Sequence, residues 1–216
     1  MTRKPFQKHL LSWMLGAISA PALAAFASTA NATTLTESLM KCDASFFNAL
    51  YEHRAELGKV AKVEQRDTLA WISVPDRTER AKAIAAFSTP LIENGLRLTG
   101  FYDFYFDLGD GGTYYFWGFP IEQSPEKVMA ATPQAGWRKA GEYYISNPQI
   151  KLTPQASWQP NPAAAADIEP TPGSAEKVVM LSDEGGTSLL MCSIQGSVNG
   201  TLLNQERPDL ARRAAQ

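Results

Sequence analysis

Ten aromatic residues fall within the nineteen positions from Phe101 to Phe119, and they constrain the fold more than any other feature. The two aromatic runs flank residues 108–112, which read Leu-Gly-Asp-Gly-Gly. Aromatic side chains favour the pleated surface of a strand, while Gly and Asp accept the backbone conformations of a tight turn. The sequence therefore predicts a β-hairpin over residues 98–120, with large apolar groups on both faces. Such a hairpin is covered on both sides, or it exposes one face as a binding surface.

Other segments predict further helices and strands around this hairpin. Helical spacing of apolar residues and helix-forming composition occur at 35–57, 77–87, 91–94 and 124–131. Apolar, β-prone runs occur at 68–74, 142–146, 177–182 and 187–194. We expect an α+β fold, with an antiparallel sheet of about five or six strands, the aromatic hairpin at its centre and two or three helices packed on it.

Changes in composition divide the chain into five parts. We expect a signal peptide (1–32), a main α+β domain (33–151), a Pro/Ala-rich loop (152–176), a C-terminal hairpin of the same domain (177–203) and a flexible polar tail (204–216).

The first 32 residues have the three parts of a secretory signal. A basic start precedes an apolar stretch over 10–27, and Ala30-Asn31-Ala32 forms an A-x-A cleavage site. Pro21 and the many small residues argue against a membrane anchor, and cleavage after Ala24 is an alternative. The pattern predicts a periplasmic protein that is cleaved after Ala32 and keeps no membrane span.

Residues 2–8 read Thr-Arg-Lys-Pro-Phe-Gln-Lys and resemble the twin-arginine export motif, with Lys4 in place of the second arginine. The resemblance concerns only the export route, and general secretion is the alternative. Twin-arginine export would imply that the protein crosses the membrane already folded. That route would strengthen the case for a cofactor or a partner.

The mature chain would be mildly acidic. Residues 1–32 hold three of the 20 Lys and Arg residues and no Asp or Glu, which leaves 17 basic and 22 acidic residues and a net charge of −5. Nucleic acids and anionic lipid surfaces select Lys/Arg clusters. The charge therefore argues against both as partners.

Cys42 and Cys192 are the two cysteines of the chain. In an oxidising compartment an even pair indicates a disulfide, here one that ties the C-terminal hairpin to the first helix. Closing a loop of this length is worth about 4–5 kcal/mol in chain entropy. A redox-active pair is the alternative, although such pairs are usually close in sequence.

The sequence offers little catalytic chemistry. His53 is the one histidine after residue 32, and the G-x-S-x-G pattern of a serine nucleophile is absent. Asp103 and Asp107 would lie about 13 Å apart on one strand face, too far for a pair of glycosidase carboxylates. The turn at 107–112 lacks the spacing of a calcium loop. We therefore predict no catalytic residue, no metal site and no cofactor.

The aromatic hairpin is the strongest candidate for a binding surface. Its candidate residues are Phe101, Tyr105, Tyr115 and Trp117, which could stack on sugar rings or anchor a protein. The leading hypothesis is a non-catalytic periplasmic binding protein, such as an inhibitor, immunity or envelope accessory factor, with an envelope protein or a glycan as partner. The alternatives are a hydrolase of envelope glycans that works through carboxylates, and an assembly partner of an exported redox complex.

The export signal gives the first testable prediction. N-terminal sequencing of protein from the periplasm should begin at Thr33. Arg3→Lys should impair export only if the twin-arginine route operates, because general secretion needs positive charge rather than arginine. Intact residues 1–32 on protein extracted from membranes would contradict cleavage.

Overall fold

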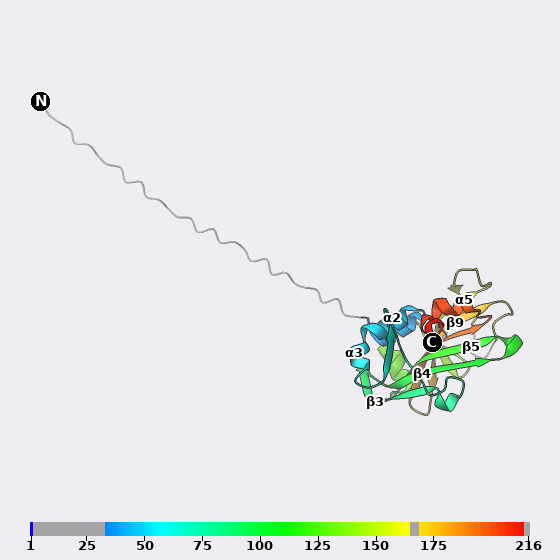
Figure 1. Cartoon of the computed structure of the whole chain (residues 1–216), viewed down its shortest axis with the longest axis horizontal. Coiled ribbons are helices and arrows are strands. Elements are labelled where there is room, and N and C mark those ends of the chain that lie inside the picture. The colour runs from blue at the N-terminus through cyan, green and yellow to red at the C-terminus, as the bar shows by residue number, and fades with distance from the viewer. Residues whose placement is uncertain (2–32, 165–168, 214–216) are drawn as a thin grey trace. The chain divides into compact units, whose positions relative to one another are not determined.

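A computed structural model describes residues 1, 33–164 and 169–213 of the chain (Figure 1). The predicted signal peptide at residues 2–32, part of the Pro/Ala-rich loop at 165–168, and residues 214–216 lie outside the described residues. The account of the fold below concerns the unit that begins at Thr33.

The described part contains short helices and mostly longer strands. The α-helices are α1 (Leu35–Lys41), α2 (Ser45–Glu52), α3 (Arg54–Leu57), α4 (Pro125–Ala131), α5 (Gly200–Glu206) and α6 (Pro208–Arg213). The 3₁₀ turns are η1 (Arg80–Lys82), η2 (Gly109–Gly111) and η3 (Pro133–Ala135). The strands are β1 (Val63–Arg66), β2 (Leu69–Ile72), β3 (Ile84–Glu93), β4 (Leu96–Asp107), β5 (Thr113–Ile121), β6 (Arg138–Ala140), β7 (Tyr143–Lys151), β8 (Gln159–Pro160), β9 (Ala175–Asp183) and β10 (Ser188–Gly196). None of the helices described is long and apolar enough to cross a membrane.

The strands form one large antiparallel sheet and a separate two-stranded hairpin. The large sheet has the order β3-β4-β5-β10-β9-β7-β6, with β8 added on β7, and the small hairpin pairs β1 with β2. The predicted α+β class with an antiparallel sheet is confirmed, although the sheet has eight strands rather than five or six. The sequence patterns missed mainly the short strands and β3.

The predicted aromatic hairpin is formed by β4 and β5 (Figure 1). Tyr105 lies opposite Tyr115, and the chain reverses through η2. Gly109 and Gly112 have φ angles of 62° and 89°, which a residue with a side chain rarely adopts. The turn glycines therefore specify the reversal, as the sequence predicted.

The two faces of the large sheet have different coverings. The main hydrophobic core contains residues from each of the six described helices, including Phe46, Val128 and Leu202, packed against one sheet face. A second, smaller core lies on the other face and includes Tyr102, Met180 and Met191. Its described members come from strands and loops and not from an α-helix. The described α-helices therefore pack on one face only.

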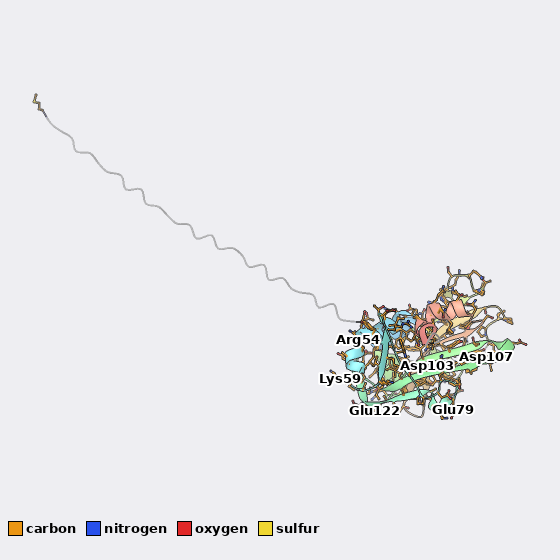
Figure 2. All side chains as sticks on the ribbon, in the orientation of Figure 1. Arg54, Lys59, Glu79, Asp103, Asp107 and Glu122 are labelled. Atoms are coloured by element: carbon orange, nitrogen blue, oxygen red, sulfur yellow. A yellow bond between two sulfur atoms is a disulfide. The ribbon has the colours of Figure 1, made fainter. Side chains whose placement is uncertain are left out.

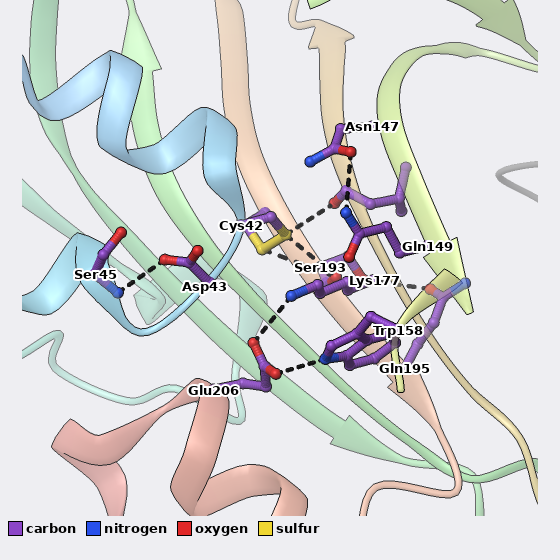
Figure 3. Close-up of a disulfide and its surroundings, with 12 residues drawn as sticks. Cys42, Asp43, Ser45, Asn147, Gln149, Trp158, Lys177, Ser193, Gln195 and Glu206 are labelled. Carbon is purple, nitrogen blue, oxygen red and sulfur yellow. Dashed lines mark hydrogen bonds and ion pairs between the residues drawn. A yellow bond between two sulfur atoms is a disulfide. The ribbon is translucent and has the colours of Figure 1, made fainter. Parts of the chain in front are cut away.

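A disulfide joins Cys42, directly after α1, to Cys192 in the middle of β10 (Figure 3). The two Cα atoms are 5.3 Å apart and 150 positions apart in sequence. Cys192 lies between Trp117 of β5 and Val179 of β9 in the sheet. The predicted bridge between the first helix and the C-terminal hairpin is thus present, and it is compatible with an exported protein.

The predicted helix over residues 35–57 is instead three helices. The chain turns at Cys42, which has a left-handed φ of 54° and caps α1. Asp43 then accepts a 2.8 Å hydrogen bond from the backbone N–H of Ser45 at the start of α2. The break lets Cys42 reach the sheet while α2 packs beside β2.

The predicted helices over 77–87 and 91–94 are wrong, because most of this region forms β3. Pairing with β4 outweighs the helix-forming alanines, and Pro90 lies at an irregularity in the pairing between Ala86 and Leu91. Asn94 and Gly95, with φ angles of 50° and 78°, then make a tight hairpin turn into β4.

The predicted flexible tail is also wrong as far as the structure describes it, because α5 and α6 belong to the fold. Arg207 and Asp209, at 0% exposure, are fully buried. The Arg207 guanidinium donates to Asp103 of β4 at 3.2 Å and to Asp209 at 3.0 Å. It also lies over the rings of Trp117 and Phe47. These ion pairs compensate for the burial of the charged groups, so this polar segment can pack in the core.

Glu206, next to Arg207, forms a second ion pair between the C-terminal helices and the sheet (Figure 3). Its carboxylate lies 3.3 Å from the ammonium of Lys177 in β9 and accepts a 2.7 Å hydrogen bond from the Trp158 indole. The Trp158 ring also lies 4.7 Å from the Lys177 ammonium. The start of the Pro/Ala-rich loop is therefore anchored to the C-terminal helices.

Replacing Arg207 tests this anchor. Arg207→Met should lower the free energy of unfolding by about 3–5 kcal/mol, because the buried carboxylates of Asp103 and Asp209 both lose the guanidinium that they contact. Urea denaturation measures the change. The exposed Arg66→Met is the control and should cost less than about 0.5 kcal/mol. Equal, small effects of both variants would contradict a buried anchor.

Candidate functional site

The four residues that the sequence favoured as a binding surface lie on the helix-covered face of the sheet. Phe101 and Trp117 are fully buried, Tyr115 is 8% exposed, and Tyr105 is half-buried. Phe101 and Trp117 are thus inaccessible to a partner, which corrects the prediction for these two residues.

Packing against the helices explains their burial. The Phe101 ring stacks on Phe46 of α2, with centroids 6.3 Å apart and an angle of 9° between the planes. Trp117 contacts Phe47 of the same helix, at 6.1 Å. Tyr105 and Tyr115 lie 4.8 Å apart across the hairpin. The Phe101 and Trp117 rings therefore pack α2 on the sheet.

The opposite side of the same hairpin has an aromatic surface that no described helix covers. Because side chains alternate along a strand, every second residue of the central strands reaches this side. We call this side the open face, and it consists of Tyr102, Phe104, Phe106, Tyr114, Phe116, Met180, Leu189 and Met191.

Gly118 is the one residue without a side chain in its row of the sheet, where it lies between Tyr102 and Met191. An added Cβ atom would lie 2.1 Å from the carbonyl oxygen of Leu190, which the structure could not accept without a shift. The close backbone approach therefore requires glycine.

Stacked rings line the open face along the hairpin. Phe106 and Tyr114 are nearly parallel, with centroids 4.7 Å apart and an angle of 4° between the planes. Phe104 and Phe116 follow at 6.2 Å and 29°. The three phenylalanines are only half-buried, so their rings present apolar surface to solvent. Aromatic surface of this kind is what ligand sites usually offer.

A cavity of about 260 Å³ opens on this face. It is lined by Arg80, Tyr143 and Gln195 in addition to the open face. A second cavity of about 260 Å³ shares Arg80, Tyr102 and Leu189 with the first and continues toward Glu184. The two cavities are neighbours that share these three lining residues, and we call them together the groove.

The groove has two charged lining residues among those described, Arg80 in both cavities and Glu184 in the second. Arg80 is the one charged side chain among the described residues that line the first cavity. Burial raises the pKa of Tyr102 to about 12, although the positive charge of Arg80 acts in the opposite direction. Burial also raises the pKa of Tyr114, with smaller effects from Glu169 and Glu176. Both phenols therefore keep their protons at neutral pH.

The residues with catalytic potential do not come together. Asp103 lies in the middle of β4, where it binds Arg77 and Arg207, and Asp107 lies near the exposed hairpin tip (Figure 2). The Nε2 atom of His53 is 3.0 Å from the backbone oxygen of Thr33. Both cysteines are in the disulfide. Within the described ranges, no group of three or more His, Cys, Asp or Glu residues could hold a metal ion.

The sequence missed the part of the open face that comes from β9 and β10. Met180, Leu189 and Met191 enter it only because β10 pairs with β5, a long-range pairing that no local pattern encodes. A signal was present on the hairpin itself: Tyr102, Phe104 and Phe106 alternate without a charged residue. These residues indicate an apolar strand face, and Gly118 on the second arm adds no side chain to it.

Comparison of the chain with protein-family models, curated proteins and solved structures finds no match. Function is therefore argued from the geometry of the described residues.

Proposed function

We propose that the protein is an exported, non-catalytic binding protein that works in the periplasm after removal of residues 1–32. Its binding site is the groove on the open face, and its ligand is a small molecule with a substantial apolar part. The A-x-A signal and the Cys42–Cys192 disulfide support export. The placement of the catalytic candidates favours binding over hydrolysis, since Asp103 is neutralised by arginines.

One observation carries the proposal: half-buried phenylalanines line a groove on the sheet face that no described helix covers. Apolar surface that stays in contact with water costs free energy, about 25 cal/mol for each Å². A groove of this kind with a few polar groups at its edge is the usual form of a small-molecule site. The rings and methionines of the lining favour a ligand with a substantial apolar part, and polar groups such as Arg80, Tyr143 and Gln195 can contact a polar end of it.

Fluorescence of an uncharged apolar dye, N-phenyl-1-naphthylamine, tests the proposal with the mature chain. The dye should bind the unmodified protein and gain fluorescence. Phe116→Ala should weaken binding about tenfold, or about 1.4 kcal/mol, because the variant loses a ring from the groove. Phe104→Ala should act in the same direction.

Tyr105→Ala is the matched control, because Tyr105 is also a half-buried aromatic residue of the hairpin but lies on the helix-covered face. Circular dichroism should first establish that each variant is folded. Dye binding that Phe116→Ala and Phe104→Ala leave unchanged, or that Tyr105→Ala weakens equally, would rule out the open face as the site.

A further inference from the structure

Arg80 lies at the edge of the groove, between its two cavities, and lines both. It begins η1, a turn that several contacts fix against the sheet. Asp76 accepts hydrogen bonds from the backbone and hydroxyl of Thr78, at 2.9 and 2.8 Å, and Ala83 is fully buried. These contacts fix the backbone of the turn, and the exposed Arg80 side chain extends from it beside both cavities.

The charge of Arg80 is not balanced by an ion pair, in contrast to its neighbours. Lys82 pairs with Glu79 at 2.6 Å, and Arg77 pairs with Asp103 at 3.1 Å. Arg80 forms no ion pair with a carboxylate of the residues that the structure describes. Its guanidinium can therefore bind an anion without first releasing a partner, and it can do so with two parallel hydrogen bonds.

Tyr102 and Glu184 complete the surroundings of Arg80. Tyr102 lines both cavities and keeps its phenolic proton, so its hydroxyl can donate a hydrogen bond. Glu184 lines the second cavity, and its carboxylate accepts a 2.7 Å hydrogen bond from Ser182. The negative charge of Glu184 directs an anion toward the first cavity, where Arg80 is the charged group.

The groove beyond Arg80 suits one extended apolar chain. Tyr102 and Phe106 are four positions apart on β4, which corresponds to about 13 Å. A volume of about 260 Å³ lies just below the roughly 300–1,000 Å³ of sites for drug-sized ligands. A cavity of this size fits a single chain of medium length better than the two chains of a lipid.

We propose that the ligand is a single-chain amphiphile with an anionic head group, such as a medium-chain fatty acid. The head group binds Arg80 and the Tyr102 hydroxyl, and the chain lies over Gly118 against the methionines and phenylalanines of the open face. This inference rests on the proposed function and names the class of its ligand.

Displacement of N-phenyl-1-naphthylamine by decanoate and by decanol tests the head group, because the two molecules have equal chains and differ in charge. The unmodified mature protein should bind decanoate about tenfold more tightly than decanol. Arg80→Gln should abolish this preference by weakening decanoate alone. Higher salt should reduce the preference, because an exposed ion pair is screened.

Two further variants serve as controls. Lys82→Gln removes a positive charge from the same turn but outside the groove, and it should leave the preference unchanged. Glu184→Gln should tighten decanoate binding about two- to threefold and leave decanol unchanged, because it removes a negative charge from the second cavity.

The outcomes separate this inference from the proposed function. If decanol binds as tightly as decanoate, or Arg80→Gln leaves the preference intact, the anionic head group is refuted while the apolar groove stands. Dye binding without displacement by either molecule also refutes the amphiphile. If the dye itself does not bind, the proposed function fails together with the inference.

Discussion

The buried ion pair between Asp103 and Arg207 is the constraint on which the rest of the domain depends. A charge at 0% exposure is tolerated only with a partner, because its removal from water costs several kcal/mol. Burial alone would lower the pKa of Arg207, but the carboxylates of Asp103 and Asp209 outweigh it and raise the pKa. Asp103 in β4 thus requires the C-terminal helices on its own face of the sheet. With the Cys42–Cys192 bridge bringing α1 to the same side, the helices gather on one face, and the other face carries none of the described ones.

Local chemistry was sufficient to predict part of the fold. The aromatic hairpin, the strands of the C-terminal hairpin, the disulfide and a helix that begins with Pro125 follow from turn residues, β-prone runs and helix capping signals. The residues of β3 were misassigned because alanines favour helix in isolation, whereas pairing with β4 decides the outcome. The Asn94-Gly95 turn was a local hairpin signal that outweighs helix propensity. The C-terminal helices could not be predicted, since the partner that buries Arg207 lies 104 positions away.

The contact between Arg207 and Asp103 also explains why the hairpin was predicted correctly but the binding surface was assigned to the helix-covered face. Phe101 and Tyr105 alternate with aspartates, which is the usual pattern of a solvent-exposed strand face. Asp103 is nevertheless buried, because Arg207 neutralises it. The all-apolar alternation on the opposite face is the usual pattern of a core, yet the described helices leave it uncovered. Binary patterning fails here because the ion pair between Asp103 and Arg207 allows helices to bury a strand face that carries an aspartate.

The central claim is that the two faces of one sheet differ in role, with a core under the helices and a ligand groove on the open face. Methionine methyl NMR of the mature chain tests it directly, because Met180 and Met191 line the groove whereas Met40 and Met129 pack on the helix-side core. Titration with N-phenyl-1-naphthylamine should shift the methyl signals of Met180 and Met191 and leave those of Met40 and Met129 in place. Shifts confined to Met40 and Met129, or no shift at any of the four, would contradict the account.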